Sequence, residues 1–388
     1  MTKQTETKII YLDNAATSFP KPPCVYERME KFLREESANP GRSGHRMSVE
    51  AEASVERARA LLAKFFGIRN SSRIAFTLNC TDALNMAIKG VVHEGDHVIT
   101  SVLEHNSVLR PLHALQEDGV IELIKIKPDG ETILNPEEVR KAVKEETRLI
   151  VLTHASNVTG AIQPIREIGK IAREGGALFL VDAAQTAGAV PIDVEKDFID
   201  LLAFPGHKSL LGPTGTGGLY VSERVEKISP WREGGTGMGS ESPTHPEEFP
   251  YVLEGGTPNT VGIVGLAEGL KFVGEKGIDN IRAHELKLMK TLREGIKEIK
   301  KIKTYGPKSV EKSTAALSFT IEGPEAAEAA VILDESFNIA VRAGLQCAPL
   351  MHQFLGTSPL GTLRVSPGVF NSLEEIEKLL EALGQIVK

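Results

Sequence analysis

Apolar runs rich in β-branched residues alternate with amphipathic stretches over the first ~220 residues, a pattern typical of an α/β domain with a mostly parallel sheet. The runs that predict strands are Ile74–Leu78, His97–Ser101, Ile121–Ile126, Leu149–Thr153, Ala177–Val181, Leu201–Phe204 and Gly218–Val221. The stretches that predict helices include Val49–Phe66, Asp82–Gly90, Ser107–Glu117 and Ile165–Arg173. We therefore expect a large α/β domain built on one mostly parallel seven-stranded sheet.

The pattern changes in the last third of the chain. Gly234–Thr260 is rich in glycine, proline, serine and glutamate, which predicts a long loop. Two helical stretches follow, Val261–Gly274 and Asn280–Lys300. The elements predicted after them are short strands at Ala316–Thr320, Ile339–Val341 and Leu363–Val365, and a helix from Leu373. This part of the chain predicts a second, smaller α+β unit.

Composition and charge narrow the class of protein. The chain has 388 residues, enough for two or three domains or for one large and one small domain. Its net charge is −7 and it contains no basic run, which argues against a nucleic-acid partner. We expect no membrane partner, because no apolar run reaches the ~20 residues of a membrane helix and the N-terminus lacks the apolar core of a signal peptide. The cysteine spacings fit neither a metal site nor disulfides, so we expect thiols in a cytoplasmic protein: Cys24, Cys80 and Cys347.

Two short motifs suggest sites that their sequence context does not support. His93 and His97 match the zinc motif H-E-x-x-H, which needs both histidines on one face of a continuous helix. Gly95 and Asp96 form a turn pair and a strand follows at once, so we expect no metal site. The cluster Gly234–Gly239 does not complete G-x-G-x-x-G and follows no clear strand, so we interpret it as a flexible loop.

Polar side chains follow five of the predicted strands. Because ligands bind at the carboxyl ends of strands in open α/β sheets, these side chains are candidates for one site. In chain order they are Asn79, Cys80, Thr81 and Asp82, then Glu104, His105 and Asn106, then His154 and Asn157, then Asp182 and Gln185, and last His207 and Lys208. A single polar residue at a strand end is ordinarily a cap or a turn former, but five sets at one edge favour a ligand site.

The chemistry of these side chains fits a single cofactor. Thr81 opens a helix whose N-terminal N–H groups suit a phosphate. Asp182 ends a very apolar run, where a carboxylate needs a cation such as a protonated pyridine nitrogen, and Gln185 can reach a ring hydroxyl. Lys208 supplies an amine for a covalent bond to an aldehyde, although a lysine in a turn is ordinarily a solvated surface residue. Together these groups predict pyridoxal 5′-phosphate.

The chain resembles the class V aminotransferase family and, within it, the cysteine desulfurases of the Suf type. The matching stretches span nearly the whole chain: YLDNAATSFPKP (11–22), NPGRSGH (39–45), EHNSVLRP (104–111), HASNVTGAIQPI (154–165), VDAAQTAGAVPID (181–193), GHKSLLGPTGTGGLYV (206–221), GGTPNT (255–260) and VRAGLQCAPLMH (341–352). The resemblance implies the homodimeric type I fold of pyridoxal-phosphate enzymes. We place its large cofactor-binding domain at 15–257 and its small α+β domain at 1–14 and 258–388.

The resemblance also implies a role for each residue that matches the family's cofactor site. Lys208 is similar to the lysine that binds the cofactor covalently. The other expected cofactor contacts are Asp182 at the pyridine nitrogen, Gln185 at the ring oxygen, His105 stacked on the ring face, Asn157 near the ring oxygen and the substrate, Thr81 and His207 at the phosphate, and Thr257, which the other subunit lends to the phosphate.

The same resemblance predicts how the substrate and its sulfur are held. Arg364 is similar to the arginine that binds the substrate carboxylate, a task suited to a bidentate fork, and Arg342 is a second substrate-binding candidate. Cys347 resembles the nucleophile that takes the sulfur. A cysteine can equally be a small buried apolar residue, but Gly344 and Pro349 place this one on a loop, and Arg342 can favour its thiolate.

Two positions depart from the pattern of related sequences. Gln346 stands where a histidine often precedes the nucleophilic cysteine, and Pro205 stands where a serine often lies near the phosphate. The first departure puts local acid–base assistance to Cys347 in doubt, and the second removes one phosphate contact.

The expected reaction converts L-cysteine into L-alanine and leaves the sulfur as a persulfide on Cys347, which passes it to an acceptor or scaffold protein, as in iron–sulfur cluster assembly. One alternative is a selenocysteine lyase, or another C–S lyase of the same fold, that does not depend on Cys347. Another is a sulfur-relay subunit that retains the fold without its chemistry, although Lys208, Asp182, His105 and Arg364 argue against it.

Overall fold

A computed structural model describes residues 9–41, 44–239 and 241–387 of the chain. The first eight residues of the predicted segment 1–14 lie outside this description, as do Arg42 and Ser43 of the stretch at 39–45, Ser240 of the long loop, and Lys388.

The predicted sheet of seven strands is confirmed. Its strands lie in the order β2-β8-β7-β6-β5-β3-β4, and β8 is the strand that runs antiparallel to its neighbours. The bounds are β2 Ile74–Thr77, β3 Asp96–Ser101, β4 Ile121–Ile126, β5 Thr147–Thr153, β6 Leu178–Asp182, β7 Leu201–Pro205 and β8 Gly217–Val221. The carboxyl ends of β2, β3, β5, β6 and β7 therefore share one edge of the sheet, as the polar strand ends predict.

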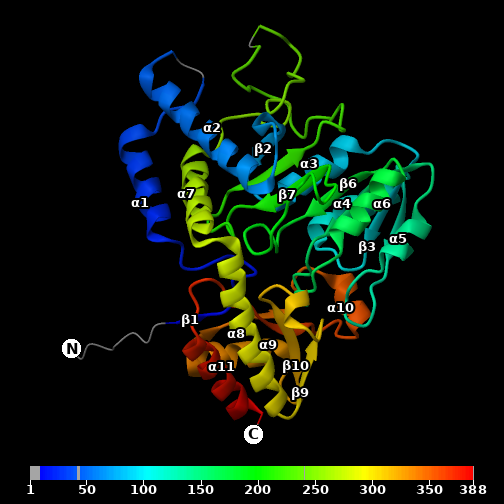
Figure 1. Cartoon of the computed structure of the whole chain (residues 1–388), viewed down its shortest axis with the longest axis vertical. Coiled ribbons are helices and arrows are strands. Elements are labelled where there is room, and N and C mark those ends of the chain that lie inside the picture. Colours follow the sequence, from blue (N-terminus) through cyan, green and yellow to red (C-terminus); the bar gives the residue numbers. More distant parts are fainter. Residues whose placement is uncertain (1–8, 42–43, 240, 388) are drawn as a thin grey trace.

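The central strands are apolar throughout because helices cover both faces of the sheet (Figure 1). In β5, Ile150 and Leu152 belong to one hydrophobic core, while Leu149 and Val151 point into the other. The helices that pack in the first core are α2 Arg46–Phe66, α5 Pro136–Ala142, α6 Ile165–Glu174 and α7 Thr260–Lys276, and those in the second are α3 Cys80–Val91 and α4 Asn106–Glu117. We call the sheet and these helices the large unit.

A four-stranded antiparallel sheet forms the core of a small unit, which lies below the large unit in Figure 1. Its strands, in the order β12-β13-β10-β9, are β12 Arg342–Gly344, β13 Thr362–Val365, β10 Leu317–Ile321 and β9 Ile302–Tyr305. Helices α9 Ala326–Phe337 and α11 Leu373–Ile386 and the pair β1 Ile10–Tyr11 with β11 Ile339–Ala340 pack with it. Helix α10 Pro349–Leu355 follows β12, and its Met351 packs in the first core of the large sheet. The sequence pattern does not predict β9, β12, α9 or α10.

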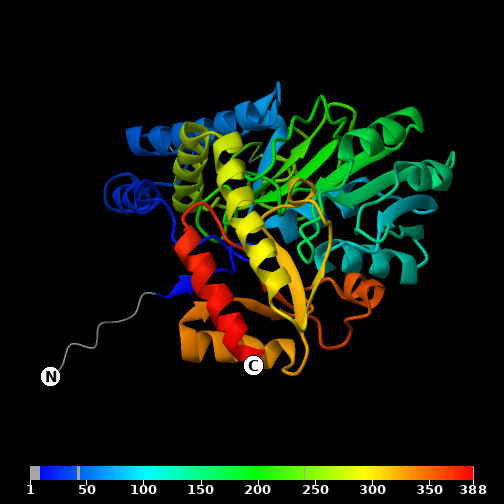
Figure 2. The same ribbon diagram turned by 60° about the horizontal axis from the view of Figure 1, so that its bottom comes forward.

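Two helices connect the units. Helix α7 contacts α2 and α1 Pro23–Lys31, and it contributes Ile263 and Leu266 to the core of the large sheet. The predicted boundary at residues 257 and 258 thus precedes a helix that packs with the large unit, and the division into two domains stays a prediction. Helix α8, Ile278–Glu298, then runs from the large unit into the small one, as Figures 1 and 2 show.

Within the described ranges, no helix combines the length and the apolar character that a membrane span needs.

Candidate active site

A buried carboxylate marks the centre of the strand-end edge. Asp182 is the last residue of β6 and is only 2% exposed. Within the described part of the chain, its carboxylate accepts an N–H from Ala184 at 2.8 Å and an S–H from Cys80 at 3.5 Å, both at Oδ1. Burial raises the pKa of Cys80 well above its usual value, so this side chain stays a thiol and a donor. The second oxygen, Oδ2, thus remains for a cationic partner.

Lys208 follows β7 at the same edge and is half-buried. Burial lowers the pKa of its amine, and the negative charge of Asp182 acts in the opposite direction. Among the described residues, the amine forms neither an ion pair nor a hydrogen bond. Lys208 therefore offers an amine that loses its proton more readily than an ordinary lysine, next to a carboxylate that needs a cation.

The N-termini of α3 and α4 meet beside this pair. Thr81 Oγ1 lies 2.7 Å from Ser107 Oγ, which in turn lies 2.8 Å from His105 Nδ1. His105 caps α4 by accepting the Ser107 N–H, so its neutral ring carries the proton on Nε2. Burial lowers the pKa of His105, which favours this neutral ring. Two helix N-termini, joined by the contact between Thr81 of α3 and Ser107 of α4, suit an anion.

Three side chains of the N-terminal segment bind the backbone immediately before Lys208. Thr17, Ser18 and Lys21 all donate side-chain hydrogen bonds to the His207 carbonyl, and Ser18 also donates to the carbonyl of Lys208. Burial lowers the pKa of Lys21 to about 8. The His207 ring lies 3.1 Å from Thr17 Oγ1, and burial together with the two lysine charges lowers its pKa to about 4. His207 is consequently neutral near pH 7 and able to donate to a phosphate.

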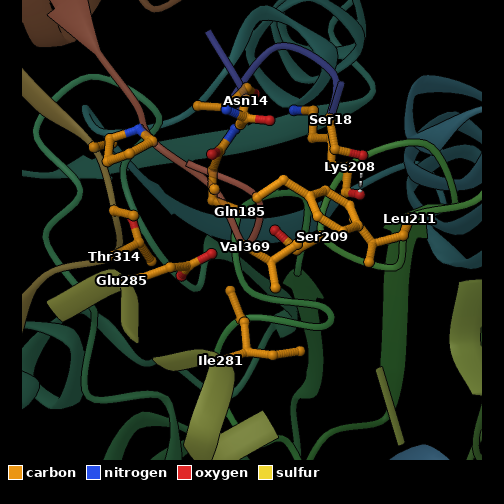
Figure 3. Close-up of a pocket in the computed structure, with 17 residues that line it drawn as sticks. Asn14, Ser18, Gln185, Lys208, Ser209, Leu211, Ile281, Glu285, Thr314 and Val369 are labelled. Carbon is orange, nitrogen blue, oxygen red and sulfur yellow. Dashed lines mark hydrogen bonds between the residues drawn. The ribbon is translucent and has the colours of Figure 1, made fainter. Parts of the chain in front are cut away.

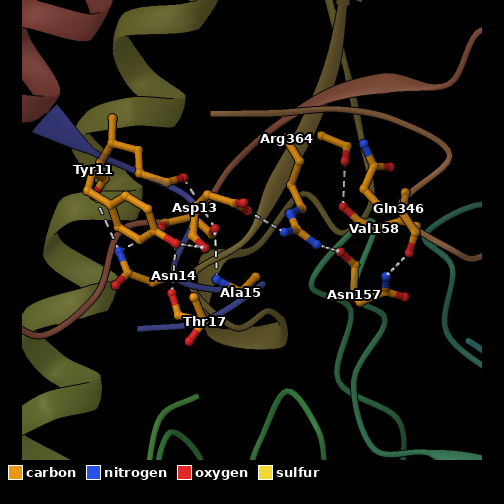
Figure 4. A network of polar contacts seen from close by, with 12 residues as sticks. Tyr11, Asp13, Asn14, Ala15, Thr17, Asn157, Val158, Gln346 and Arg364 are labelled. Carbon is orange, nitrogen blue, oxygen red and sulfur yellow. Dashed lines mark hydrogen bonds and ion pairs between the residues drawn. The ribbon is translucent and has the colours of Figure 1, made fainter. Parts of the chain in front are cut away.

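The substrate-binding candidates lie on neighbouring strands of the small unit. Arg342 of β12 and Arg364 of β13 are directly opposite each other in the antiparallel register. Arg364 is 2% exposed, donates to Asp13 at 2.6 Å and to the Asn157 carbonyl at 2.9 Å, and keeps its Nε without a partner in the described part of the chain (Figure 4). Like charges in a cross-strand pair repel, and Asp13 offsets only one of them. The pair is thus suited to a second carboxylate.

Cys347 lies on the turn between β12 and α10 and is exposed. The turn meets the large unit through two backbone carbonyls: Asn157 Nδ2 donates to that of Gln346 at 2.6 Å (Figure 4), and the Asn106 N–H donates to that of Cys347 at 2.8 Å. These contacts hold the cysteine against the segments that follow β3 and β5, at the strand-end edge that also carries His105 and Asp182.

Gln185 points from the strand-end edge into a cavity of about 40 Å³ between the two units (Figure 3). Its amide donates to the Ala15 carbonyl at 3.0 Å. Glu285 of α8 lines the same cavity, is 8% exposed and forms no hydrogen bond or ion pair within the described part of the chain. Burial raises its pKa to about 8, so this carboxyl is largely protonated at neutral pH. The sequence pattern did not single out Glu285.

Thr257 is apart from the other predicted residues. It is exposed in the loop before α7 and lines a separate hollow with Gly215 and Asn259. A buried ion pair fixes this loop: Arg59 lies 2.7 Å from Glu254, whose carboxylate also accepts the Phe76 N–H at 2.6 Å. Pro205, the second departure, is the buried last residue of β7 and pairs with Gly217.

The residues at this edge fit pyridoxal phosphate. The free oxygen of Asp182 can meet a protonated pyridine nitrogen, and the unpaired Lys208 amine can meet an aldehyde. Thr81 and the neutral His207 can hold the phosphate, while His105 and Gln185 line the same edge. Each of these assignments stays a prediction.

Sequence reasoning missed three side chains that complete this edge, Asp13, Ser18 and Lys21, whereas Glu104 was among the strand-end candidates. Glu104 is fully buried between β3 and β5, where its carboxyl accepts the Thr153 N–H at 2.9 Å, and burial raises its pKa well above the usual value. Its place after a strand was a signal for its position. Asp13, Ser18 and Lys21 reach the edge from a segment that precedes the first predicted strand, so no periodicity placed them there.

The rejected zinc motif is split between two elements. His93 precedes the turn, whereas His97 is buried inside β3. No group of three or more histidine, cysteine or acidic side chains arranged to hold a metal occurs in the part of the chain that the structure describes.

Comparisons with known proteins agree with this architecture. The model of the family "Aminotransferase class-V" matches residues 10–379. A probable cysteine desulfurase of Pyrococcus abyssi is 38% identical over 98% of this chain and 95% of its own length, and one of Methanothermobacter thermautotrophicus is 37% identical over 97% and 94%. The apo structure of a cysteine desulfurase from Thermococcus onnurineus superposes with a TM-score of 0.92, at 36% identity, over 98% of this chain and 94% of that one. The predicted fold class is confirmed by this neighbour.

Replacing Glu285 with glutamine should change how stability depends on pH. The folded pKa is about 8 and lies above the unfolded value of 4.5, so the folded state binds the extra proton and Glu285 destabilises the fold increasingly as pH rises from 4.5 to 8. At pH 8, Glu285→Gln should therefore increase the free energy of unfolding by ~1–4 kcal/mol, and the difference should shrink toward pH 5. Urea unfolding at both pH values measures it.

Glu294→Gln is the matched control, because Glu294 is exposed on the same helix. A difference between Glu285→Gln and the wild type that is equal at both pH values would show that the carboxyl is not buried in its neutral form.

Proposed function

The chain belongs to the aminotransferase class-V family, and we propose that it is a cysteine desulfurase, which uses pyridoxal 5′-phosphate to convert L-cysteine into L-alanine and leaves the sulfur as a persulfide on Cys347. One observation carries the proposal. The Lys208 amine and the Asp182 carboxylate lie at the strand-end edge onto which the Cys347 turn is hydrogen-bonded. A cofactor site and a solvent-exposed thiol are thus brought to one place by different units.

Three groups would orient the substrate. The side chains of Arg342 and Arg364, which the antiparallel register places on one face of the sheet, would take the carboxylate of L-cysteine, which relieves their mutual repulsion. Asn157 links Arg364 to the Cys347 turn: its carbonyl accepts a hydrogen bond from Arg364, and its side-chain amide donates one to the Gln346 carbonyl. A carboxylate held there directs the rest of the amino acid toward Lys208 and Cys347.

The chemical steps follow from the charge states of the side chains. When bound, pyridoxal phosphate supplies an electron sink for the bonds at the substrate Cα. Lys208, whose pKa is lowered by burial, takes the Cα proton at its amine. The Cys347 thiolate attacks the substrate sulfur, so that an S–S bond forms while the bond from sulfur to Cβ breaks. The electron pair left at Cβ takes a proton, and alanine leaves.

The exposure of Cys347 suits onward transfer of the sulfur. A persulfide at this position can be reached by a thiol of an acceptor or scaffold protein, as iron–sulfur cluster assembly requires. The three cysteines are free thiols, which is the state expected in the cytoplasm.

Replacing Cys347 with serine should stop the reaction without emptying the cofactor site. A hydroxyl is a far poorer nucleophile than a thiolate, whereas Lys208 and Asp182 are unchanged. We expect alanine and sulfide formation from L-cysteine to fall by at least about a hundredfold, with cofactor binding retained. Assays of both products and mapping of the persulfide by mass spectrometry measure this.

Cys24→Ser is the control, because Cys24 lies in α1, which packs on α7. A persulfide on Cys24 or full activity of Cys347→Ser would contradict the proposal and favour a lyase that needs no enzyme thiol, such as a selenocysteine lyase.

Replacing Arg364 with lysine should weaken the use of L-cysteine more than the binding of the cofactor. Lysine keeps a charge but loses the planar fork, and a charge-assisted hydrogen bond is worth ~1.5–3 kcal/mol. We expect kcat/KM to fall ~10–100-fold while cofactor affinity changes less than about threefold. Arg293→Lys, a partly buried arginine on α8 that bonds the Pro307 carbonyl, is the control. An unchanged kcat/KM would exclude this role.

We expect a homodimer in which Thr257 of one subunit serves the cofactor site of the other. Thr257 is exposed, and the hollow that it lines does not include Lys208 of its own chain. Mixing inactive Lys208→Ala chains with impaired Thr257→Val chains should restore activity, because one site of the mixed dimer then has both side chains. Failure to complement, or an active monomer by light scattering, would contradict this arrangement.

A further inference from the structure

The turn that carries Cys347 has an unfavourable backbone conformation. Its central residues, Gln346 and Cys347, have φ values of 42° and 60°, and the Ala348 N–H bonds the Leu345 carbonyl across the turn at 2.9 Å. Two successive positive φ values are typical of a type I′ turn, which favours Asn and Gly. A conformation of this kind persists only where surrounding contacts impose it. The contacts therefore matter more here than the local sequence.

The side chain of Gln346 supplies these contacts from the buried side of the turn. It is 4% exposed, its Nε2 donates to the Thr362 carbonyl at 2.8 Å, and its Oε1 lies 2.8 Å from His352 Nε2. Because an amide oxygen can only accept, His352 carries its proton on Nε2, and its Nδ1 accepts from the Thr357 hydroxyl at 2.7 Å. Burial lowers the pKa of His352 to about 4, which keeps this tautomer neutral. The hydrogen bonds thus run in an unbroken series from the Thr362 carbonyl through the Gln346 and His352 side chains to the Thr357 hydroxyl.

We propose that Gln346 is a positioning residue, which holds the Cys347 turn in its strained form so that the thiol stays at the strand-end edge. Its side chain ties the turn to β13 of the small unit and to α10, while its carbonyl accepts from Asn157 of the large unit. The proposal rests on the proposed role of Cys347 as the nucleophile.

This arrangement excludes direct acid–base assistance by Gln346. Its amide does not titrate, and its oxygen and one N–H are engaged inside the small unit. Its contribution is therefore geometric. Loosening the turn should slow the step that needs Cys347. Substrate binding by Arg342 and Arg364 should stay intact, since Arg364 is held by Asp13 and by the Asn157 carbonyl, neither of which involves the Gln346 side chain.

Gln346→Leu tests the proposal, with Gln353→Leu as control, because Gln353 is exposed on α10. Hydrogen exchange in the apoprotein reports on the turn through two amides, Ala348 across the turn and Asn106 on the Cys347 carbonyl. We expect Gln346→Leu to reduce the protection of both amides about tenfold or more, and the control to leave it within about twofold. Thr357→Val, which removes the outer hydroxyl only, should give a smaller reduction and tests the relay if Gln346→Leu does not fold.

Kinetics of the loaded enzyme separate positioning from a merely structural effect. We expect Gln346→Leu to lower kcat for alanine formation about tenfold or more with KM for L-cysteine within about twofold, and the alkylation rate of Cys347 by iodoacetamide to stay within about twofold. Unchanged amide protection in both Gln346→Leu and Thr357→Val, or a changed alkylation rate with unchanged protection, would overturn the proposal. If the wild type forms no alanine, the proposed function fails, whereas the exchange result still decides the role of Gln346.

Discussion

The buried carboxylate of Asp182 is the constraint on which the site depends. A carboxylate that is 2% exposed at the end of an apolar strand is costly unless a cation or several donors meet it. Ala184 and the Cys80 thiol satisfy one oxygen, and the Lys208 amine lies at the neighbouring strand end. The fold therefore holds a buried carboxylate without a cationic partner, which a protonated ring nitrogen would supply. Binding of such a ligand would offset the free-energy cost of burying the carboxylate.

The small unit completes this site through a few hydrogen bonds between distant segments. Arg364 joins β13 to Asp13 near the N-terminus and to Asn157 after β5, and Asn157 in turn holds the Cys347 turn. The residues proposed to bind the substrate and to take its sulfur are thus both tied to the contact between the units. Replacing one member of this network should disturb several roles together, because its members share partners.

The large sheet and its strand-end residues could be predicted because they follow from local pattern. Apolar runs covered on both faces identify β5 and β6, and Asp182 and Lys208 are placed by the ends of their strands. Strands β9 and β12 of the small unit were missed because they are short and only partly buried, so neither alternation nor a continuous apolar run marks them.

Side chains placed by tertiary packing could not be predicted in the same way. Lys21 precedes His207 by 186 positions, and Asp13 precedes Arg364 by 351, so no spacing in the sequence links these partners. The orientation of Gln346 depends on His352 and Thr362, which only the packing of α10 against β13 brings together. The sequence identified Gln346 as a departure, and the structure assigns its side chain to the interior.

We propose that Lys208 is the lysine whose amine bonds the cofactor. Lys21 is the sharpest rival, since it lies beside His207 and burial lowers its pKa to about 8. Incubating the protein with pyridoxal phosphate, reducing it with borohydride and mapping the modified lysine by peptide mass spectrometry distinguishes the two. We expect a pyridoxyl group on Lys208 in the wild type and none at the site in Lys208→Ala. A group on Lys21 with Lys208 unmodified would contradict it.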